Sequence, residues 1–201
     1  MAFSLASASP GLLVAFLLFA YALGSIPTGL WIARARGVDL RTIGSGNIGA
    51  TNVSRGLGKG WAITVLILDA AKGWLPMALA RRFGLPDAAI ALVGLAAIVG
   101  HMFTFFLRGK GGKGVATSLG VSLAIYPPAG LCSFALYVLA YLATRLSSVG
   151  SLLGMWSFPM FCWVFGVPRP FFLLSFATAI LVTLRHKANI ARLLRGEEKR
   201  A

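Results

Sequence analysis

Long apolar stretches separated by short polar connections dominate the chain. A helix needs about 20 predominantly apolar residues to cross a bilayer, and seven stretches approach that length. They cover residues 10–33, 61–80, 85–107, 114–126, 129–144, 148–166 and 170–185. Because no internal repeat divides them, the pattern predicts one domain over residues 1–201, an all-α integral membrane protein built as a seven-span helical bundle.

The fourth stretch is the shortest of the seven and the first is the longest. The fourth has 13 residues, too few for a full crossing unless the glycine-rich segment before it lies within the membrane boundary. Pro127 and Pro128 follow it, and because proline lacks an amide donor they favour a turn there over one helix continuing to Thr144. The first stretch has 24 residues, which exceeds the apolar core of a signal peptide and predicts a retained span.

Composition sharpens this interpretation. Of the residues, 58% are hydrophobic and 12% are charged, against about 25% charged in soluble domains, which excludes a water-soluble globule. The 19 Lys and Arg against 5 Asp and Glu give a net charge of +14, which indicates an anionic partner. With so apolar a chain, a membrane surface and anionic small molecules are better candidates than nucleic acid, which we do not expect as a partner.

The basic residues fall mainly on alternate connections. Fifteen of the 19 lie on the first, third and fifth connections and after the last stretch, whereas Arg81, Arg82 and Arg169 lie on the other side and Lys72 lies within a stretch. Since positive residues are retained in the cytoplasm, this distribution predicts an outside N-terminus and a cytoplasmic C-terminus. An even number of spans would place the basic C-terminal segment on the wrong face.

The connection over residues 37–60 is long and rich in glycine, and loops of this length are usually functional or disordered. Gly44, Gly46 and Gly49 let backbone amides approach a ligand without a Cβ in the way. Side-chain donors of the hydroxyl, amide and guanidinium types accompany them, namely Ser45, Asn47, Thr51, Asn52 and Arg55. This mixture is typical of anion binding.

The connection over residues 108–118 places glycines around Lys110 and Lys113, directly ahead of a predicted helix. Amides at a helix N-terminus together with a lysine form a phosphate cradle. The alternative for both loops is a flexible basic connector that only fixes topology, which explains the cations but not the mixture of Gly, Ser, Asn and Thr. Neither loop predicts a nucleotide fold, because no strand precedes the first and Gly114 stands where a Walker A motif needs Ser or Thr.

Five polar residues in or near the apolar stretches are further candidates. Asp69 and Lys72 have the spacing that puts them on one helix face, so we expect them to pair, either to brace a cytoplasmic loop or to touch a substrate. His101 is expected to form an interhelical hydrogen bond, with catalysis as the alternative. His186 and Asn189 are three residues apart at the end of the last stretch, so they share a helix face and are well placed to act together on a substrate. The alternative is an interfacial anchor with basic side chains that extend to the membrane surface.

Five ordered segments resemble the bacterial acyl-phosphate:glycerol-3-phosphate acyltransferases. They cover residues 24–29, 44–55, 69–73, 100–118 and 185–198. The resemblance extends over nearly the whole chain, and the nine residues before Pro10 look like an N-terminal extension. Thr104 departs from the family pattern, since many members have proline there. The resemblance implies a multi-pass enzyme of the bacterial inner membrane that transfers a fatty acyl group from acyl phosphate to the 1-hydroxyl of sn-glycerol 3-phosphate. The products would be lysophosphatidic acid and inorganic phosphate, at the start of phospholipid synthesis.

The resemblance also assigns roles to residues. Ser45, Arg55 and Lys113 are expected to hold the phosphate of glycerol 3-phosphate, with His186 and Asn189 completing that pocket. Gly111, Gly112 and Gly114 are expected to present amides to acyl phosphate. Asn47, Thr51 and Asn52 are expected to line or support the site. Asp69, Lys72 and His101, which are candidates because of their position in the apolar stretches, are expected to be supporting residues.

Several points stay open at this level. We expect no cofactor and no metal, and a monomer within the membrane lipid. The general base is either the acceptor's own phosphate or His186, and Ser45 as an acyl nucleophile is a weaker alternative. The main rival function is a phosphate-ester transporter or channel, because intramembrane Asp69 and Lys72 are compatible with a lined path.

Overall fold

The computed structural model describes residues 9–200 and shows a bundle of helices in which these residues form no strand. The expected N-terminal extension lies, apart from Ser9, outside the described residues. The helices are α1 (Pro10–Ser25), α2 (Thr28–Ala35), α3 (Ala50–Leu57), α4 (Lys59–Arg82), α5 (Asp87–Met102), the 3₁₀ turn η1 (Phe105–Leu107), α6 (Val115–Ile125), α7 (Pro127–Thr144), α8 (Ser147–Val164), α9 (Arg169–Arg185) and α10 (Lys187–Leu194).

Each of the seven predicted stretches contains a helix, so the all-helical prediction is confirmed. Within residues 9–200, four segments are long and apolar enough to cross a membrane by length and composition, namely Pro10–Ala35, Lys59–Arg82, Asp87–Leu107 and Pro127–Thr144. The pair α9 and α10, bent by 62°, makes a fifth if it is one span. The protein is therefore a multi-pass membrane protein of several apolar helices.

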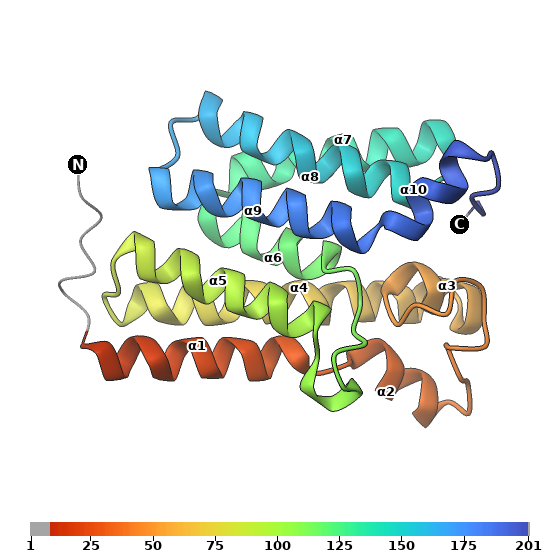
Figure 1. Ribbon diagram of the computed structural model, residues 1–201, viewed down its shortest axis with the longest axis horizontal. Coiled ribbons are helices and arrows are strands. Elements are labelled where there is room, and N and C mark those ends of the chain that lie inside the picture. The colour runs from red at the N-terminus through yellow and green to blue at the C-terminus, as the bar shows by residue number, and fades with distance from the viewer. Residues whose placement is uncertain (1–8, 201) are drawn as a thin grey trace.

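Prolines mark two breaks between helices, one inside the first predicted stretch and one between the fourth and fifth stretches. The first stretch is two helices, because α1 ends at Ser25 and α2 begins at Thr28, after Pro27, which has no amide hydrogen to donate. The predicted break before Pro127 is confirmed, since α6 ends at Ile125 and Tyr126 is extended with a φ of −154°. The second helix α2 turns the chain toward the polar end of the bundle (Figure 1).

Two glycines allow α4 and α6 to pack unusually closely. A Cβ built on Gly73 would clash with the carbonyl oxygen of Thr117, and a Cβ on Gly120 would clash with that of Ala70. Close backbone approach through small residues is the usual means of helix association in membranes, where the lipid tails are as apolar as leucine. The contact fixes the N-terminal end of α6 beside the charged middle of α4.

The polar segments gather at one end of the bundle. Figure 1 shows α3, α10 and the C-terminal end of the chain side by side at the end opposite the start of α1. The main apolar core includes Met77, Ile90, Ile98, Met102 and Val121, which come from α4, α5 and α6. This arrangement brings segments far apart in sequence to one polar face.

Candidate active site

A cavity of about 990 Å³ begins at this polar end and continues between apolar helix faces. Its polar part is lined by Ser45, Asn47, Thr51, Asn52, Arg55, Lys113, His186, Asn189, Arg192 and Glu198, and its apolar part by Ile63, Leu66, Leu119, Phe134, Leu142 and Met155. Gly114, Asp69 and His101 also line it, whereas Gly111, Gly112 and Lys72 do not. One space therefore joins a cationic, hydrogen-bonding head to an apolar body.

The first glycine-rich loop folds around the buried side chain of Asn52. Its Oδ1 accepts a hydrogen bond from the backbone N–H of Ser45 at 3.1 Å, and its Nδ2 donates to the carbonyl of Leu40 at 2.9 Å. Gly44 has a φ of +56°, and a Cβ there would meet the side chains of Asn52 and Arg55. Asn52 thus holds the loop closed, which places Ser45 and Arg55 at the mouth of the cavity.

Part of this loop is helical, which the sequence did not predict. Helix α3 begins after Gly49 and carries Thr51, Asn52 and Arg55. Thr51 Oγ1 lies 3.0 Å from Ser147 Oγ at the start of α8, and Tyr137 of α7 lies 3.3 Å from the same hydroxyl. The chain of hydroxyls ties the first loop to the far wall of the cavity.

The second glycine-rich loop contradicts one expectation. The amide of Gly111 donates to the carbonyl of Met102 at 3.2 Å, and the amide of Gly112 donates to that of His101 at 3.1 Å. The prediction that these two amides face acyl phosphate is wrong for this structure, because both already have backbone partners at the end of α5. Gly114 differs, since it lines the cavity as the N-cap of α6 with a φ of +84°.

Lys113 and the junction of α9 and α10 meet across the cavity. Lys113 Nζ donates to Asn189 Oδ1 at 2.6 Å. The bend of 62° at His186 turns α10 so that His186 and Asn189 both line the cavity, as their spacing predicted. His186 Nδ1 lies 2.8 Å from the carbonyl of Val182, and because a carbonyl only accepts, Nδ1 carries the proton and Nε2 is the free ring nitrogen.

The charge environment of Lys113 prepares it for an anion. Burial is the main cause that lowers its pKa to about 8, and the cations Arg192, Arg55 and Arg185 add to the fall, whereas Glu198 opposes it. A phosphate bound among these groups would favour the charged lysine, since an opposite charge stabilises the ionised form. The polar head is therefore a site with excess positive charge.

Glu198 is a site residue that the residue-by-residue argument missed. Its carboxylate accepts hydrogen bonds from Ser148 Oγ at 2.9 Å, Asn189 Nδ2 at 2.5 Å and Arg192 Nε at 2.6 Å. Burial raises its pKa, but these hydrogen bonds outweigh burial and leave the pKa below its usual value. The sequence feature that points to Glu198 is the presence of an acidic residue in a strongly basic C-terminal segment.

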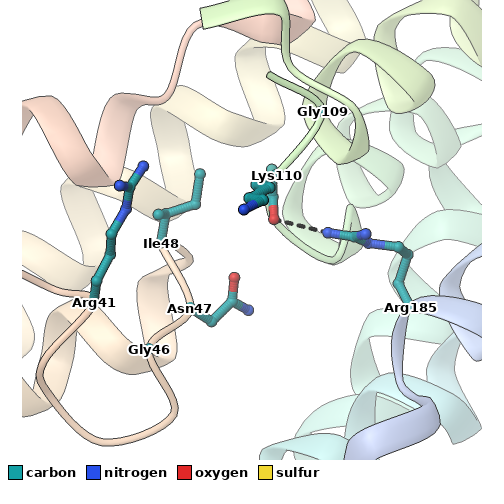
Figure 2. Close-up of a pocket in the computed structure, with 8 residues that line it drawn as sticks. Arg41, Gly46, Asn47, Ile48, Gly109, Lys110 and Arg185 are labelled. Atoms are coloured by element: carbon teal, nitrogen blue, oxygen red, sulfur yellow. Dashed lines mark hydrogen bonds between the residues drawn. The ribbon is translucent and has the colours of Figure 1, made fainter. Parts of the chain in front are cut away.

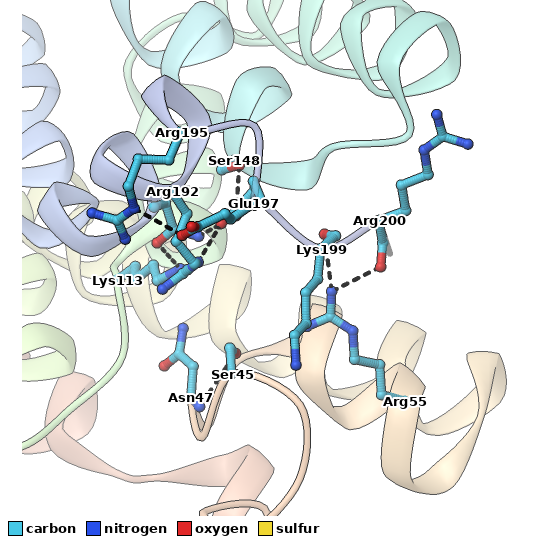
Figure 3. Close-up of polar contacts among 12 residues, drawn as sticks. Ser45, Asn47, Arg55, Lys113, Ser148, Arg192, Arg195, Glu197, Lys199 and Arg200 are labelled. Carbon is cyan, nitrogen blue, oxygen red and sulfur yellow. Dashed lines mark hydrogen bonds and ion pairs between the residues drawn. The ribbon is translucent and has the colours of Figure 1, made fainter.

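The C-terminal segment also reaches Arg55. Arg55 Nη2 donates to the carbonyl of Arg200 at 3.1 Å and to that of Lys199 at 3.4 Å. Figure 3 shows Arg55 pointing to this segment while Ser45, Asn47 and Lys113 lie nearer the middle of the site. The first loop, the second loop and the C-terminal segment thus form one hydrogen-bonded rim.

Asp69, Lys72 and His101 form a charged cluster inside the bundle that links the helices next to the site. Lys72 Nζ lies 2.7 Å from Asp69 Oδ1, which confirms the predicted pair, and it also donates to the carbonyl of Ile26 at 2.7 Å. Thr28 donates to the same carboxylate, and Lys72 Nζ lies 3.4 Å from His101 Nδ1. These contacts favour the bracing role, and His101 is the interhelical hydrogen-bonding residue that was expected.

A smaller polar cavity of about 450 Å³ lies on the other side of the second loop. Figure 2 shows Arg41, Asn47, Lys110 and Arg185 around it. Asn47 lines both cavities. The first glycine-rich loop, which carries Asn47, therefore borders both cavities.

Comparisons with known proteins match nearly the whole chain to one family. The family described as glycerol-3-phosphate acyltransferase matches residues 14–196. The glycerol-3-phosphate acyltransferase of Geobacter sulfurreducens is 48% identical over 90% of this chain and 93% of its own length. That of Anaeromyxobacter dehalogenans strain 2CP-C is 50% identical over 96% of this chain and 99% of its own.

Solved structures agree as well. The fold is similar to the crystal structure of an integral membrane glycerol 3-phosphate acyltransferase in its glycerol 3-phosphate form, with a TM-score of 0.91 and 42% identity over 94% of this chain and 95% of that chain. The lysophosphatidic acid form of that acyltransferase gives a TM-score of 0.89 and 41% identity, over 94% of both chains.

Proposed function

The chain belongs to the glycerol-3-phosphate acyltransferase family, and from this membership we propose that its acyl donor is acyl phosphate and its acceptor atom the 1-hydroxyl of sn-glycerol 3-phosphate. It is an acyltransferase of phospholipid synthesis, as its relatives and the solved structures with glycerol 3-phosphate and lysophosphatidic acid indicate. One observation carries the proposal further: a single cavity joins a cationic head to an apolar body, which suits phosphate groups at one end and a fatty chain at the other.

The phosphate of glycerol 3-phosphate is assigned to Ser45, Arg55 and Lys113, with His186 and Asn189 completing its pocket. The close contact of Lys113 with Asn189 supports this assignment, because it brings the second loop and the last helices to one point. Asn47 and Thr51 line the same space. Asn52 acts by holding the loop that presents Ser45.

The donor is assigned to the space that continues from Gly114 along α6 and α7. Its acyl chain would lie against the apolar residues of the cavity. Its phosphate would lie near the amide end of α6, where a helix N-terminus favours an anion. Gly111 and Gly112 would shape this loop without contacting the donor through their amides.

Acyl transfer requires that the enzyme position the hydroxyl and the acyl phosphate, and it requires no covalent enzyme intermediate. The 1-hydroxyl oxygen attacks the acyl carbonyl, the new C–O ester bond forms, and the anhydride C–O bond breaks with inorganic phosphate as the leaving group. Two phosphates must be held close together, so neutralisation by Arg55 and Lys113 lowers the barrier. The hydroxyl proton is assigned to the acceptor's own phosphate, whose second pKa is near 6.

Topology and location complete the proposal. We expect seven spans, an outside N-terminus and a cytoplasmic C-terminus in the bacterial inner membrane, with the polar head of the cavity on the cytoplasmic side. Support comes from the basic connections, which include the loops that border the cavity. We expect a monomer to be active, since all assigned residues come from one chain.

The test is turnover by the purified protein in detergent with palmitoyl phosphate and glycerol 3-phosphate. We expect equal amounts of lysophosphatidic acid and inorganic phosphate, with no other protein present. No turnover with acyl phosphate, but turnover with acyl thioesters, would overturn the donor. Uptake of labelled glycerol 3-phosphate into liposomes without any donor would instead favour the transporter.

A further inference from the structure

The guanidinium of Arg185 holds the backbone of the second glycine-rich loop. Nε donates to the carbonyl of Gly112 at 3.1 Å, and Nη2 donates to the carbonyl of Gly111 at 2.8 Å. The same guanidinium lies over the ring of Phe103, 5.4 Å from its centre. Figure 2 shows the side chain reaching from the last helices to the loop.

The loop is held from its opposite edge as well. The amides of Gly111 and Gly112 donate to the carbonyls at the end of α5, so the backbone N–H and C=O of both residues have partners. A Cβ on Gly111 would clash with the carbonyl of His101, and a Cβ on Gly112 would clash with the imidazole ring of His101. Two consecutive residues are therefore held between α5 and Arg185.

The two held residues lie directly beside the substrate-binding atoms. Lys113 follows Gly112, and its ammonium group reaches Asn189. Arg185 is the last residue of α9 and immediately precedes His186, at the bend that places Asn189. Arg185 thus connects the loop that carries Lys113 to the bend that carries His186 and Asn189. The distance between these two segments decides whether the three residues can hold the same phosphate.

We propose that Arg185 is a positioning residue that fixes Lys113 relative to His186 and Asn189 by gripping the carbonyls of Gly111 and Gly112. The inference rests on glycerol 3-phosphate as the acceptor in the proposed function. A planar fork of two N–H donors matches two adjacent carbonyls, which a lysine ammonium cannot reproduce although it keeps the charge. We therefore expect the two hydrogen bonds from Arg185 to matter more for binding glycerol 3-phosphate than its positive charge.

The experiment compares Arg185→Lys and Arg185→Gln with the matched control Arg81→Lys. Arg81 Nη1 also donates to a backbone carbonyl of α6, that of Ala124 at 2.8 Å, but at the opposite end of that helix. For each protein we would measure kcat and KM for glycerol 3-phosphate, and the rise in the thermal midpoint that glycerol 3-phosphate produces without donor. The second measurement does not depend on which acyl donor is used.

We expect Arg185→Lys and Arg185→Gln to raise KM for glycerol 3-phosphate by about tenfold or more, since small misplacements of binding groups are costly. The ligand-induced rise in thermal midpoint should shrink in both, whereas Arg81→Lys should change both quantities less than twofold. A stability role alone would lower the amount of active enzyme and leave KM unchanged, and that result would overturn the proposal.

Two other results have equally definite meanings. A wild-type KM in Arg185→Lys would mean that the positive charge suffices, and the proposal would be wrong. If the wild-type protein fails to use acyl phosphate but is stabilised by glycerol 3-phosphate, the donor assignment fails, and Arg185 is then judged by the ligand-induced stabilisation of its variants.

Discussion

Lys113 and Asn189 are 76 residues apart in sequence, and the lysine ammonium donates a hydrogen bond of 2.6 Å to the amide oxygen of the asparagine. The contact joins the end of the second glycine-rich loop to the helix after the bend at His186. It defines the cationic head of the cavity, because Arg55, Arg192 and Glu198 line the same space. The predictions below start from this pair.

Replacing Lys113 with Gln should lower kcat/KM for glycerol 3-phosphate by about tenfold to a hundredfold. In the proposed site, the substitution removes a charge-assisted hydrogen bond to the phosphate, and such bonds contribute about 1.5 to 3 kcal/mol. Steady-state kinetics in detergent measure the effect. Lys187→Gln, an exposed position on α10 outside the cavity, is the control and should behave as wild type.

Activity should fall as the pH rises through about 8. Burial is the main cause that lowers the pKa of Lys113 to that value, and only the protonated lysine attracts phosphate, so kcat/KM is lost as the ammonium deprotonates. In kcat the fall should come at higher pH, because bound phosphate stabilises the charged form. Lys113→Arg should lack the alkaline fall, and an unchanged profile in that variant would assign it to another group.

Glu198→Gln should lower the free energy of unfolding by about 1 to 3 kcal/mol, because its carboxylate accepts from three side chains. The folded-state pKa of Glu198 is lowered, so its stabilisation is present above the ordinary carboxyl range and is lost as the pH falls below it. Thermal unfolding at neutral and acidic pH measures this. Glu197→Gln, which breaks an exposed pair with Arg195, should change stability little.

Gly120→Ala should destabilise the bundle by about 1 to 3 kcal/mol, because the added methyl group meets the backbone of Ala70 and α4 and α6 must separate. Activity should fall with it, since α6 carries the glycine-rich loop at its start. Gly60→Ala is the matched control, a helical glycine with open space around its Cβ position. A thermal midpoint in Gly120→Ala equal to that of Gly60→Ala would contradict the packing argument.

His186→Gln distinguishes the two candidates for the general base. If the acceptor's phosphate takes the proton, the variant should raise KM for glycerol 3-phosphate more than it lowers kcat, since glutamine can still form hydrogen bonds. Binding by ligand-induced stabilisation and kcat by initial rates separate the two effects. Loss of kcat by several orders of magnitude with intact binding would make His186 the base.

Local sequence patterns predicted much of the molecule. Seven apolar stretches each contain a helix, and the prolines after Tyr126 end α6 where a turn was expected. The i,i+3 spacing of Asp69 and Lys72 predicted their ion pair, and that of His186 and Asn189 predicted a shared face. These features follow from short-range rules, since transfer into lipid and helical geometry act on neighbours along the chain.

Contacts between distant segments could not be predicted in this way. The grip of Arg185 on the loop spans 74 residues, the bond from Ser148 to Glu198 spans 50, and Gly111 and Gly112 use their amides on α5 instead of facing a ligand. A glycine-rich sequence says that backbone groups are accessible, but not which partner reaches them first. That choice depends on the distances between packed helices. The sequence by itself therefore determined the long apolar helices and the chemistry available, and only the tertiary structure decided which of those groups meet.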